Sequence, residues 1–150
     1  MRTVIQRVDK ASVNIGGGET SSIGKGLLIL LGIETTDQSD DVEWLCKKIS
    51  GLRIFPDDEG IMNLSVNDVQ GEILIVSQFT LHASTKKGNR PSYIKAAHPS
   101  VAVPLYEEFI RSMQLSSRKK VKTGEFGAMM DISLINSGPV TIIIDSKTRE

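Results

Sequence analysis

Apolar and polar residues alternate at the start of the chain, which is the pattern of strands with one buried face. Thr3–Val8 and Ala11–Ile15 follow this pattern. The three glycines Gly16–Gly18 then predict a hairpin turn into a polar strand that ends at Ile23. The apolar segment Leu27–Ile33 does not alternate, and therefore predicts a strand at the centre of a sheet, buried on both faces.

Two segments show the spacing of amphipathic helices, with apolar residues three or four positions apart. In the first, the apolar positions lie within Val42–Ile49, acidic residues come early and Gly51 follows. Cys46 lies on its apolar face, so we expect a buried structural thiol and no catalytic role. In the second, the apolar positions lie within Leu105–Met113, and Pro104 is acceptable at the first helical position.

The remaining apolar segments predict further strands, at Leu52–Phe55, Glu72–Leu81, Met129–Ile135 and Val140–Asp145. The segment Asn136–Thr141 joins the last two, and its Gly and Pro are typical of a hairpin turn. A β-rich chain with two inserted helices predicts an α+β fold, in which the helices cover a mostly antiparallel sheet or barrel. The length of 150 residues predicts a single domain, residues 1–150.

The amino-acid composition limits the partners, the location and the cofactors that we expect. The 18 Lys and Arg residues balance the 18 Asp and Glu residues, so any contact with RNA has to come from a local basic patch. No apolar run approaches the roughly 18 residues of a membrane-spanning helix, and the N-terminus lacks a signal-peptide core. We therefore expect a cytoplasmic protein with no membrane partner. One cysteine and two histidines predict no disulfide, no metal and no cofactor.

The motifs of several enzyme classes are missing. The chain has no Gly-x-Ser-x-Gly motif, no phosphate loop and no dinucleotide-binding fingerprint. His82 follows a predicted strand and His98 precedes Pro99 in a predicted loop. Neither has partners at a recognisable triad spacing, so we expect both to be exposed or edge histidines.

Hydroxyl and amide side chains interrupt the apolar strand that begins at Glu72. Strand alternation places Ser77 and Phe79 on one face, and Gln78 and Thr80 on the other. Taken alone, these residues are ordinary for the end of a strand, and the basic segment from residue 86 to 90 is an ordinary solvated loop. More than local spacing is needed to assign chemistry to them.

Five segments, taken together and in order, carry a resemblance to a known family. They are Met1–Val8, Ser77–Leu81, Lys86–Pro91, Gly124–Met130 and Asn136–Thr141. In this order the chain resembles the D-aminoacyl-tRNA deacylases, homodimeric editing enzymes that hydrolyse the ester bond of D-aminoacyl-tRNA and release the D-amino acid. The resemblance covers essentially the whole chain. It implies a compact β-barrel-like α+β fold and a role in translation quality control, with the 3′ acceptor end of aminoacyl-tRNA as partner.

The resemblance also implies an active site at the subunit interface. In the family, a Gly-Pro segment of one subunit enters the pocket of the other, beside the strand that matches Ser77–Thr80. That Gly-Pro bond is cis in the family, so Gly138–Pro139 is expected to be cis here. Its carbonyls would face the α-carbon of the substrate and exclude an L side chain, which is proofreading by rejection. D-aminoacyl groups, and glycine mischarged on a non-cognate tRNA, would be accepted.

Roles follow for individual residues. We expect catalytic roles for Ser77, Gln78, Phe79 and Thr80, substrate contacts from Phe126, Met129, Ser137, Gly138 and Pro139, and tRNA contacts from Lys86, Lys87 and Arg90. An aminoacyl ester is already activated, so its hydrolysis needs positioning and an oxyanion stabiliser more than a strong nucleophile. Backbone N–H groups near Phe79 and Thr80 would stabilise the oxyanion. The Ser77 and Thr80 hydroxyls and the Gln78 amide would orient substrate or water, with the terminal ribose 2′-OH assisting, as proposed for the family.

Three alternatives stay open at this point. Thr80 could act as a covalent nucleophile, which requires a base that the sequence does not identify. The chain could be a non-catalytic RNA-binding module that retains the fold. It could also be an amidase or peptidase for small D-peptides, which would need a better base than His82 or His98.

Three positions bear on the comparison with the family. His82 and Ser84 depart from common family patterns, and they leave the shape of the pocket rim open. Ser77 stands where a related subfamily has proline before the glutamine and a trans Gly-Pro bond, so Ser77 favours the D-specific branch.

Overall fold

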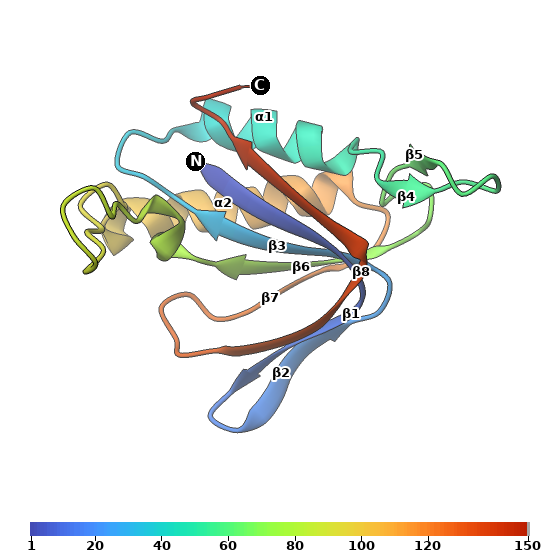
Figure 1. Ribbon diagram of the computed structural model, residues 1–150, viewed down its shortest axis with the longest axis horizontal. Coiled ribbons are helices and arrows are strands. Elements are labelled where there is room, and N and C mark those ends of the chain that lie inside the picture. The colour runs from blue at the N-terminus through green and yellow to red at the C-terminus, as the bar shows by residue number, and fades with distance from the viewer. Residues whose placement is uncertain (150) are drawn as a thin grey trace.

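A computed structural model describes residues 1–149, with the exception of the Glu19 side chain. Its elements are β1 (Arg2–Ile15), β2 (Gly18–Ile23), β3 (Gly26–Gly32), α1 (Ser39–Ser50), β4 (Phe55–Pro56), β5 (Met62–Leu64), β6 (Glu72–Ser77), the 3₁₀ turn η1 (Phe79–His82), α2 (Pro99–Ser116), β7 (Val121–Thr123) and β8 (Asp131–Asp145). The main sheet has the strand order β2-β1-β3-β6-β7, and β8 also pairs with β1 (Figure 1).

The long strand β1 organises this sheet. Its first half pairs with β3, its second half pairs with β2, and β8 follows it over nearly its full length, all antiparallel. The pairs β3–β6 and β6–β7 are parallel. Because one strand changes its partner along its length, the sheet curls nearly into a barrel (Figure 1). The predicted barrel-like α+β fold with two helices is therefore confirmed, and the sheet is mixed, with three of these pairs antiparallel.

Both faces of the central strands are buried, as the sequence predicts. Leu27 and Ile29 of β3 belong to the core cluster that the two helices cover, whereas Leu28 belongs to a second cluster inside the curl of the sheet. β6 alternates in the same way, with Ile73 in the first cluster and Leu74 in the second. Alternate side chains thus fill two cores, which explains why β3 and β6 are apolar without interruption.

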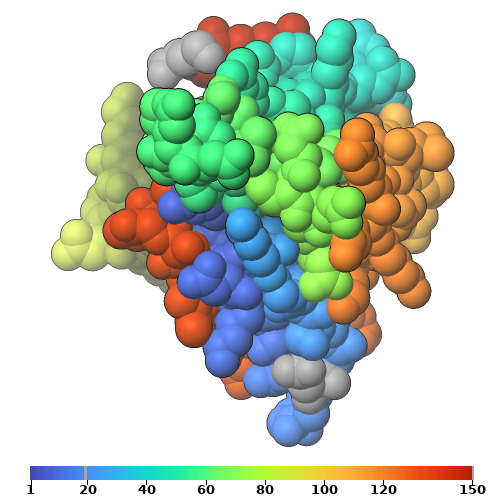
Figure 2. Space-filling model, turned by 90° about the vertical axis from the view of Figure 1, so that its right-hand side faces the viewer, coloured from blue at the N-terminus to red at the C-terminus, as the bar shows by residue number. Residues whose placement is uncertain are grey.

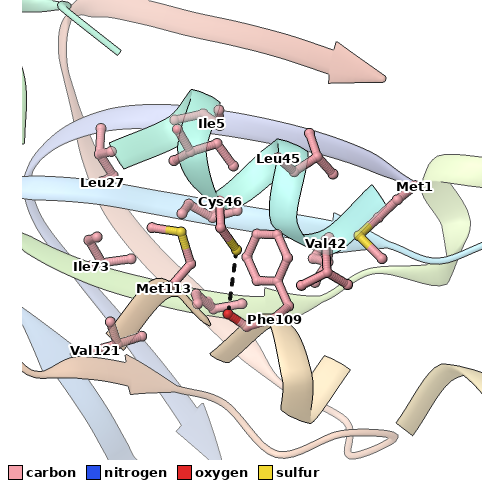
Figure 3. Close-up of a cluster of buried hydrophobic side chains, with 14 of the residues drawn as sticks. Met1, Ile5, Leu27, Val42, Leu45, Cys46, Ile73, Phe109, Met113 and Val121 are labelled. Atoms are coloured by element: carbon pink, nitrogen blue, oxygen red, sulfur yellow. Dashed lines mark hydrogen bonds between the residues drawn. The ribbon is translucent and has the colours of Figure 1, made fainter. Parts of the chain in front are cut away.

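Helices α1 and α2 lie on the same side of the sheet (Figure 1). The predicted role of Cys46 is confirmed: its thiol is buried on α1, with Sγ 3.7 Å from the Phe109 carbonyl oxygen of α2 (Figure 3). Burial raises the pKa of Cys46 to about 12, so the thiol does not form a nucleophilic thiolate near neutral pH. In the described part of the chain, no helix has the length and apolar character needed to cross a membrane.

The second helix begins earlier than predicted. α2 starts at Pro99, and Pro104 lies inside it instead of at its first position. The His98 side chain caps this helix, because its Nδ1 accepts a hydrogen bond from the Ser100 N–H at 3.3 Å. Pro99 suits the first turn because the missing N–H has no partner there. The first turn of α2 cannot be predicted from apolar spacing, because Ala102 is its only buried residue.

The last two predicted strands are one strand, and the hairpin predicted at Asn136–Thr141 is wrong. β8 pairs antiparallel with β1 both before and after this segment, with Val8 opposite Asn136 and Gln6 opposite Thr141. Residues 137–140 therefore lie opposite Arg7 alone and form a bulge. The predicted cis bond at Gly138–Pro139 is confirmed and lies in this bulge. The predicted strand at Leu52–Phe55 is also wrong over most of its length, because only Phe55 belongs to β4.

A buried carboxylate ties α1 to the end of the chain. Oδ2 of Asp41 accepts hydrogen bonds from the Gln38 N–H at 2.9 Å and from the Lys147 ammonium at 2.7 Å. Burial of Asp41 raises its pKa, but the hydrogen bonds from Lys147 and Gln38 outweigh this effect and lower the pKa from 3.8 to about 2.

This pair predicts a pH dependence of stability. The folded-state pKa lies below the unfolded one, so the stabilisation is present above pH 3.8 and is lost as the pH falls towards about 2. We expect Asp41→Asn to lower the urea midpoint of unfolding at pH 6 and to have a smaller effect near pH 2. The exposed neighbour Asp40, as Asp40→Asn, serves as the control. An equal loss for Asp41→Asn at both pH values would contradict this assignment.

Candidate active site

A pocket of about 360 Å³ opens where β3 and β6 end. These two strands are parallel neighbours, so their carboxyl ends lie at the same edge of the sheet, on the side where the connection to α2 and the connection from β7 to β8 also lie (Figure 1). Ligand sites in sheets with parallel strands form at this edge. The pocket is lined by Leu31, Ile33, Val76, Ser77, Gln78, Phe79, Ala97, Ala102, Phe126, Gly127, Ala128, Met129, Met130 and Ile132.

The chain leaves β6 through a tight turn, so the strand predicted to run to Leu81 is wrong beyond Ser77. The Gln78 N–H still donates to the Leu31 carbonyl at 2.7 Å, which continues the contact with β3. Beyond it, the Leu81 N–H donates back to the Gln78 carbonyl at 3.2 Å, as in a 3₁₀ turn. The face assignments predicted for Phe79 and Thr80 from strand alternation are therefore wrong as well.

This turn brings Gln78 and Thr80 together. The Gln78 amide Nε2 donates a hydrogen bond to Thr80 Oγ1 at 2.5 Å. The hydroxyl of Thr80 thus receives a hydrogen bond from an amide and keeps its own hydrogen available as a donor. An N–H donor is not a base, so this contact orients the Thr80 hydroxyl and does not activate it.

Two backbone donors lie at the start of η1. The N–H groups of Phe79 and Thr80 precede the first hydrogen bond of the turn, and neither donates to an acceptor within residues 1–149. Phe79 is 56% exposed, and its ring meets the Tyr93 ring edge-on at a centroid distance of 5.1 Å. The turn therefore presents two N–H groups and an aromatic ring next to the pocket.

The prediction of exposed or edge histidines is right for His98 and wrong for His82. His98 is exposed at the start of α2. The His82 side chain is buried, with 4% of the residue exposed, because η1 turns the chain inward, and its Cδ2 lies against Gly32. His82 Nδ1 is 4.0 Å from the Glu34 carboxylate, and Nε2 has no partner among the described residues.

The connection from β7 to β8 forms another wall of the pocket. Phe126 and Met129 both line it. The Phe126 ring packs on Tyr106 of α2 at a centroid distance of 5.5 Å, and the Tyr106 hydroxyl donates to the Ile75 carbonyl at 3.1 Å. Met129 is 90% exposed and lies at the rim. One chain thus brings Ser77, Gln78 and Phe79 together with these two predicted substrate contacts.

Thr80 lies on the other side of η1. It lines a groove of about 800 Å³ that runs between β8 and α1. The walls of this groove include Trp44 of α1 and Ile143 of β8, and Ile143 is 68% exposed. The turn that carries the predicted catalytic residues therefore separates a pocket from a groove.

The predicted substrate contacts on β8 lie outside the pocket. Gly138 and Pro139 are exposed, and the Arg7 guanidinium holds the bulge by donating from Nε to the Ser137 carbonyl at 3.0 Å. Arg7 pairs with Leu27 of β3, which pairs with Ile73 of β6. The bulge is therefore three strands across and four residues along from Ser77, about 20 Å when followed along the curved sheet at the usual strand spacing and rise.

The predicted tRNA contacts lie in an exposed loop between η1 and α2. Lys86, Lys87 and Arg90 are all exposed. The base of the loop is closed by two hydrogen bonds between Ser84 and Ser92, at 2.8 and 2.9 Å. This closure fixes where the loop leaves the body of the protein while its basic tip stays in solvent.

No local pattern in the sequence marks the supporting residues Arg7 and Gly32. Arg7 lies within the segment Met1–Val8 that carries the resemblance, but nothing in its spacing links it to residue 137. Gly32 ends a buried strand and gives no local signal of the turn that packs on it. Both become visible only when β1, β3 and β8 are placed side by side.

Fold and pocket together define a class of protein: a small α+β domain with a pocket at the carboxyl ends of parallel strands, a position where ligand sites commonly form. The sequence profile described as D-Tyr-tRNA(Tyr) deacylase matches residues 4–145. The chain therefore belongs to the D-Tyr-tRNA(Tyr) deacylase family.

Individual relatives agree with this assignment. The chain is 60% identical to a D-aminoacyl-tRNA deacylase of Bacteroides fragilis strain YCH46 and 58% identical to one of Flavobacterium johnsoniae, each over 100% of both chains. Among solved structures, a c-Myc DNA unwinding element binding protein has a TM-score of 0.92 and 41% identity, with 97% of this chain and 98% of that chain covered. A probable eukaryotic D-amino acid tRNA deacylase has a TM-score of 0.81 at 16% identity, over 95% and 97%, and shares the fold.

Proposed function

We propose that the chain hydrolyses the ester bond of D-aminoacyl-tRNA in the cytoplasm, which is consistent with relatives that are named D-aminoacyl-tRNA deacylase. One observation carries the proposal for this chain: the turn η1 presents the free N–H groups of Phe79, which lines the pocket, and of Thr80, which lines the adjoining groove, next to the Gln78–Thr80 hydrogen bond. Such donors stabilise the oxyanion that forms when water attacks an ester.

In this mechanism the protein positions groups and supplies no strong nucleophile. The ester carbonyl points at the N–H groups of Phe79 and Thr80, and the hydroxyls of Ser77 and Thr80 orient the ester and the attacking water. The bond from Gln78 fixes the direction of the Thr80 hydroxyl. The terminal ribose 2′-OH assists in proton transfer. The ester is already activated, so this positioning provides most of the catalysis.

We further propose that a second copy of the chain completes the site. In one chain the Gly138–Pro139 bulge lies on the surface, about 20 Å from Ser77 by strand geometry. Exposed apolar side chains at Phe79 and Ile143 support contact with another copy. In the homodimer the bulge of one subunit enters the pocket of the other, where its carbonyls exclude an L side chain and admit D side chains or glycine.

The proposal is tested by measuring deacylation of D-Tyr-tRNA, L-Tyr-tRNA and mischarged Gly-tRNA. We expect rapid loss of the D-tyrosyl and glycyl esters, with the L-tyrosyl ester spared. Hydrolysis of all three at similar rates would overturn the chiral screen. Binding of tRNA without hydrolysis of any ester would favour a non-catalytic RNA-binding module, and hydrolysis of free D-Tyr peptides would favour the peptidase alternative.

Thr80→Ala distinguishes positioning from covalent catalysis. If Thr80 positions water or substrate, its loss should lower kcat for D-Tyr-tRNA by about a hundredfold and leave clear activity. The exposed Thr85, as Thr85→Ala, is the control. Single-turnover assays measure the effect on the chemical step. A loss down to the uncatalysed rate would instead assign Thr80 as an obligatory nucleophile.

The basic loop predicts salt-dependent tRNA binding. A triple variant with glutamine in place of Lys86, Lys87 and Arg90 should bind tRNA more weakly. The slope of log Kd against log salt concentration should fall by about 2 to 3. Lys47→Gln, an exposed cation on α1, should change neither value. Filter binding at several salt concentrations provides both readouts, and an unchanged slope in the triple variant would remove the loop from the tRNA contact surface.

A further inference from the structure

A polar cleft of about 440 Å³ lies between β2 and β7, apart from the pocket and the groove. It is lined by Thr20, Ser21 and Ser22 of β2 and by residues 120–123. β2 and β7 are the two ends of the strand order β2-β1-β3-β6-β7, so the cleft is the gap that keeps the curled sheet from closing. Figure 2 shows the segment around residue 120, in orange, beside β2, in blue.

Lys122 bridges this gap. Its Nζ donates a hydrogen bond to the Ser22 carbonyl of β2 at 2.5 Å and lies 3.4 Å from the Glu72 carboxylate of β6. Glu72 also accepts a hydrogen bond from the Gly24 N–H at 2.7 Å. These contacts keep the pKa of Glu72 below its usual range, with the bond from Gly24 as the largest cause. The carboxylate and the Lys122 ammonium are thus committed to holding the walls together.

The charge around the cleft is positive. Arg118, Lys119 and Lys120 are exposed just before β7, and none of them forms an ion pair within residues 1–149. Two carboxylates face this segment, Asp68 near Arg118 and Glu72 near Lys119 and Lys122. Among the side chains that the structure describes, four cations therefore face two carboxylates, which leaves an excess of positive charge.

The walls also carry hydroxyl groups. Thr20, Ser21 and Thr123 are among the residues that line the cleft, and their hydroxyl groups make no hydrogen bond within the described part of the chain. A lysine beside unpaired hydroxyls suits a phosphate oxygen, which accepts hydrogen bonds from both. A carboxylate of the protein itself does not fill this position, because Glu72 is held by Gly24 and Lys122.

The cleft is close to the pocket along the chain. Thr123 lines the cleft and Phe126, three residues later, lines the pocket, so the backbones of these two lining residues are at most about 10 Å apart. The Gly124 N–H donates to the Ile75 carbonyl at 3.1 Å and fixes the connection to β6. A polymer whose end occupies the pocket can therefore reach the cleft within a few phosphate groups.

We propose that this cleft binds backbone phosphates of the tRNA close to its acceptor end, a contact separate from the basic loop at residues 86–90. The inference rests on the proposed function, because it takes the 3′ end to lie in the pocket. Lys119 and Lys120 supply the charge, and Thr20, Ser21 and Thr123 supply hydrogen-bond donors. Phosphate contacts position the nucleic acid without reading its sequence.

The test compares two esters in the full-length protein. The double variant Lys119→Gln/Lys120→Gln leaves the Lys122 bridge in place. We expect it to raise KM for D-Tyr-tRNA about tenfold and to leave kcat unchanged. The slope of log Kd for tRNA against log salt concentration should fall by about 2. Hydrolysis of D-tyrosyl-adenosine, which carries no phosphate, should be unchanged. The control Lys47→Gln/Arg111→Gln removes two exposed cations from the helices.

Two results would overturn the inference. An unchanged KM and salt slope would show that the cleft does not touch tRNA. An equal loss on D-tyrosyl-adenosine would show that the two lysines act through the pocket or the fold. A failure of the proposed function looks different, because wild type would then hydrolyse neither ester, and the salt slope of tRNA binding would still test the cleft.

Discussion

Replacing Gly32 with alanine is expected to lower kcat for hydrolysis of D-Tyr-tRNA by about 100-fold, because a shift of about 1 Å in a catalytic group has an effect of this size. A Cβ at Gly32 would lie 2.9 Å from Leu81 Cβ, 3.0 Å from the Gln78 carbonyl oxygen and 3.1 Å from His82 Cδ2. All three contacts belong to the turn that carries Phe79 and Thr80. The added methyl group therefore displaces the turn.

The expected change is in catalysis more than in stability. The contacts lie at the end of β3, where η1 can move away while the core between sheet and helices stays packed. Single-turnover rates with D-Tyr-tRNA and the urea midpoint of unfolding separate the two effects. Gly51→Ala is the control, because a Cβ there meets the nearest atom at an ordinary 3.5 Å. Wild-type kcat in a folded Gly32→Ala protein would contradict the role given to the turn.

Gly138→Ala is the second substitution with a large expected effect, again a loss of about 100-fold in the rate for D-Tyr-tRNA. Gly138 has a φ of 122°, which side chains rarely adopt. A Cβ would also lie 2.6 Å from Arg7 Nη2 and 3.0 Å from Val140 Cγ2. The bulge must rearrange, and Arg7 can no longer hold the Ser137 carbonyl as it does now.

This loss is informative because of where Gly138 lies. The bulge is exposed and remote from Ser77 within one chain, so its rearrangement does not reach the pocket of the same chain. Gly60→Ala, also at positive φ but in the turn before β5, is the matched control for backbone strain. The assay follows D-Tyr-tRNA, L-Tyr-tRNA and Gly-tRNA together. Full D-specific activity in Gly138→Ala would exclude the bulge from the site.

Periodicity was enough to predict the interior of the fold. The apolar run of β3 and the helical spacing of α1 depend on local burial, which a sequence displays directly. The predicted hairpin at Asn136–Thr141 failed for a different reason. Gly and Pro serve a bulge as well as a turn, and the choice between them depends on β1 being long enough to pair with both halves of β8.

Likewise, only a part of the candidate site could be predicted from the sequence. Ser77 and Gln78 follow from the strand and from the resemblance, but the turn at Phe79 and the burial of His82 depend on the approach of η1 to Gly32. Strand alternation cannot anticipate this approach, because Phe79–Leu81 is apolar enough to continue a strand. The distance of Gly138 from the pocket is a property of the sheet order, which no local pattern contains.

Subunit complementation tests the shared site most directly. If two copies of the chain share the site, Gly32→Ala and Gly138→Ala homodimers are each expected to be nearly inactive. When equal amounts of the two unfolded variants are mixed and refolded, half of the dimers are heterodimers. In each heterodimer one of the two sites combines an intact turn with an intact bulge. About a quarter of wild-type activity towards D-Tyr-tRNA should therefore return. If the mixture is no more active than the two variants alone, the site is not shared between two copies of the chain.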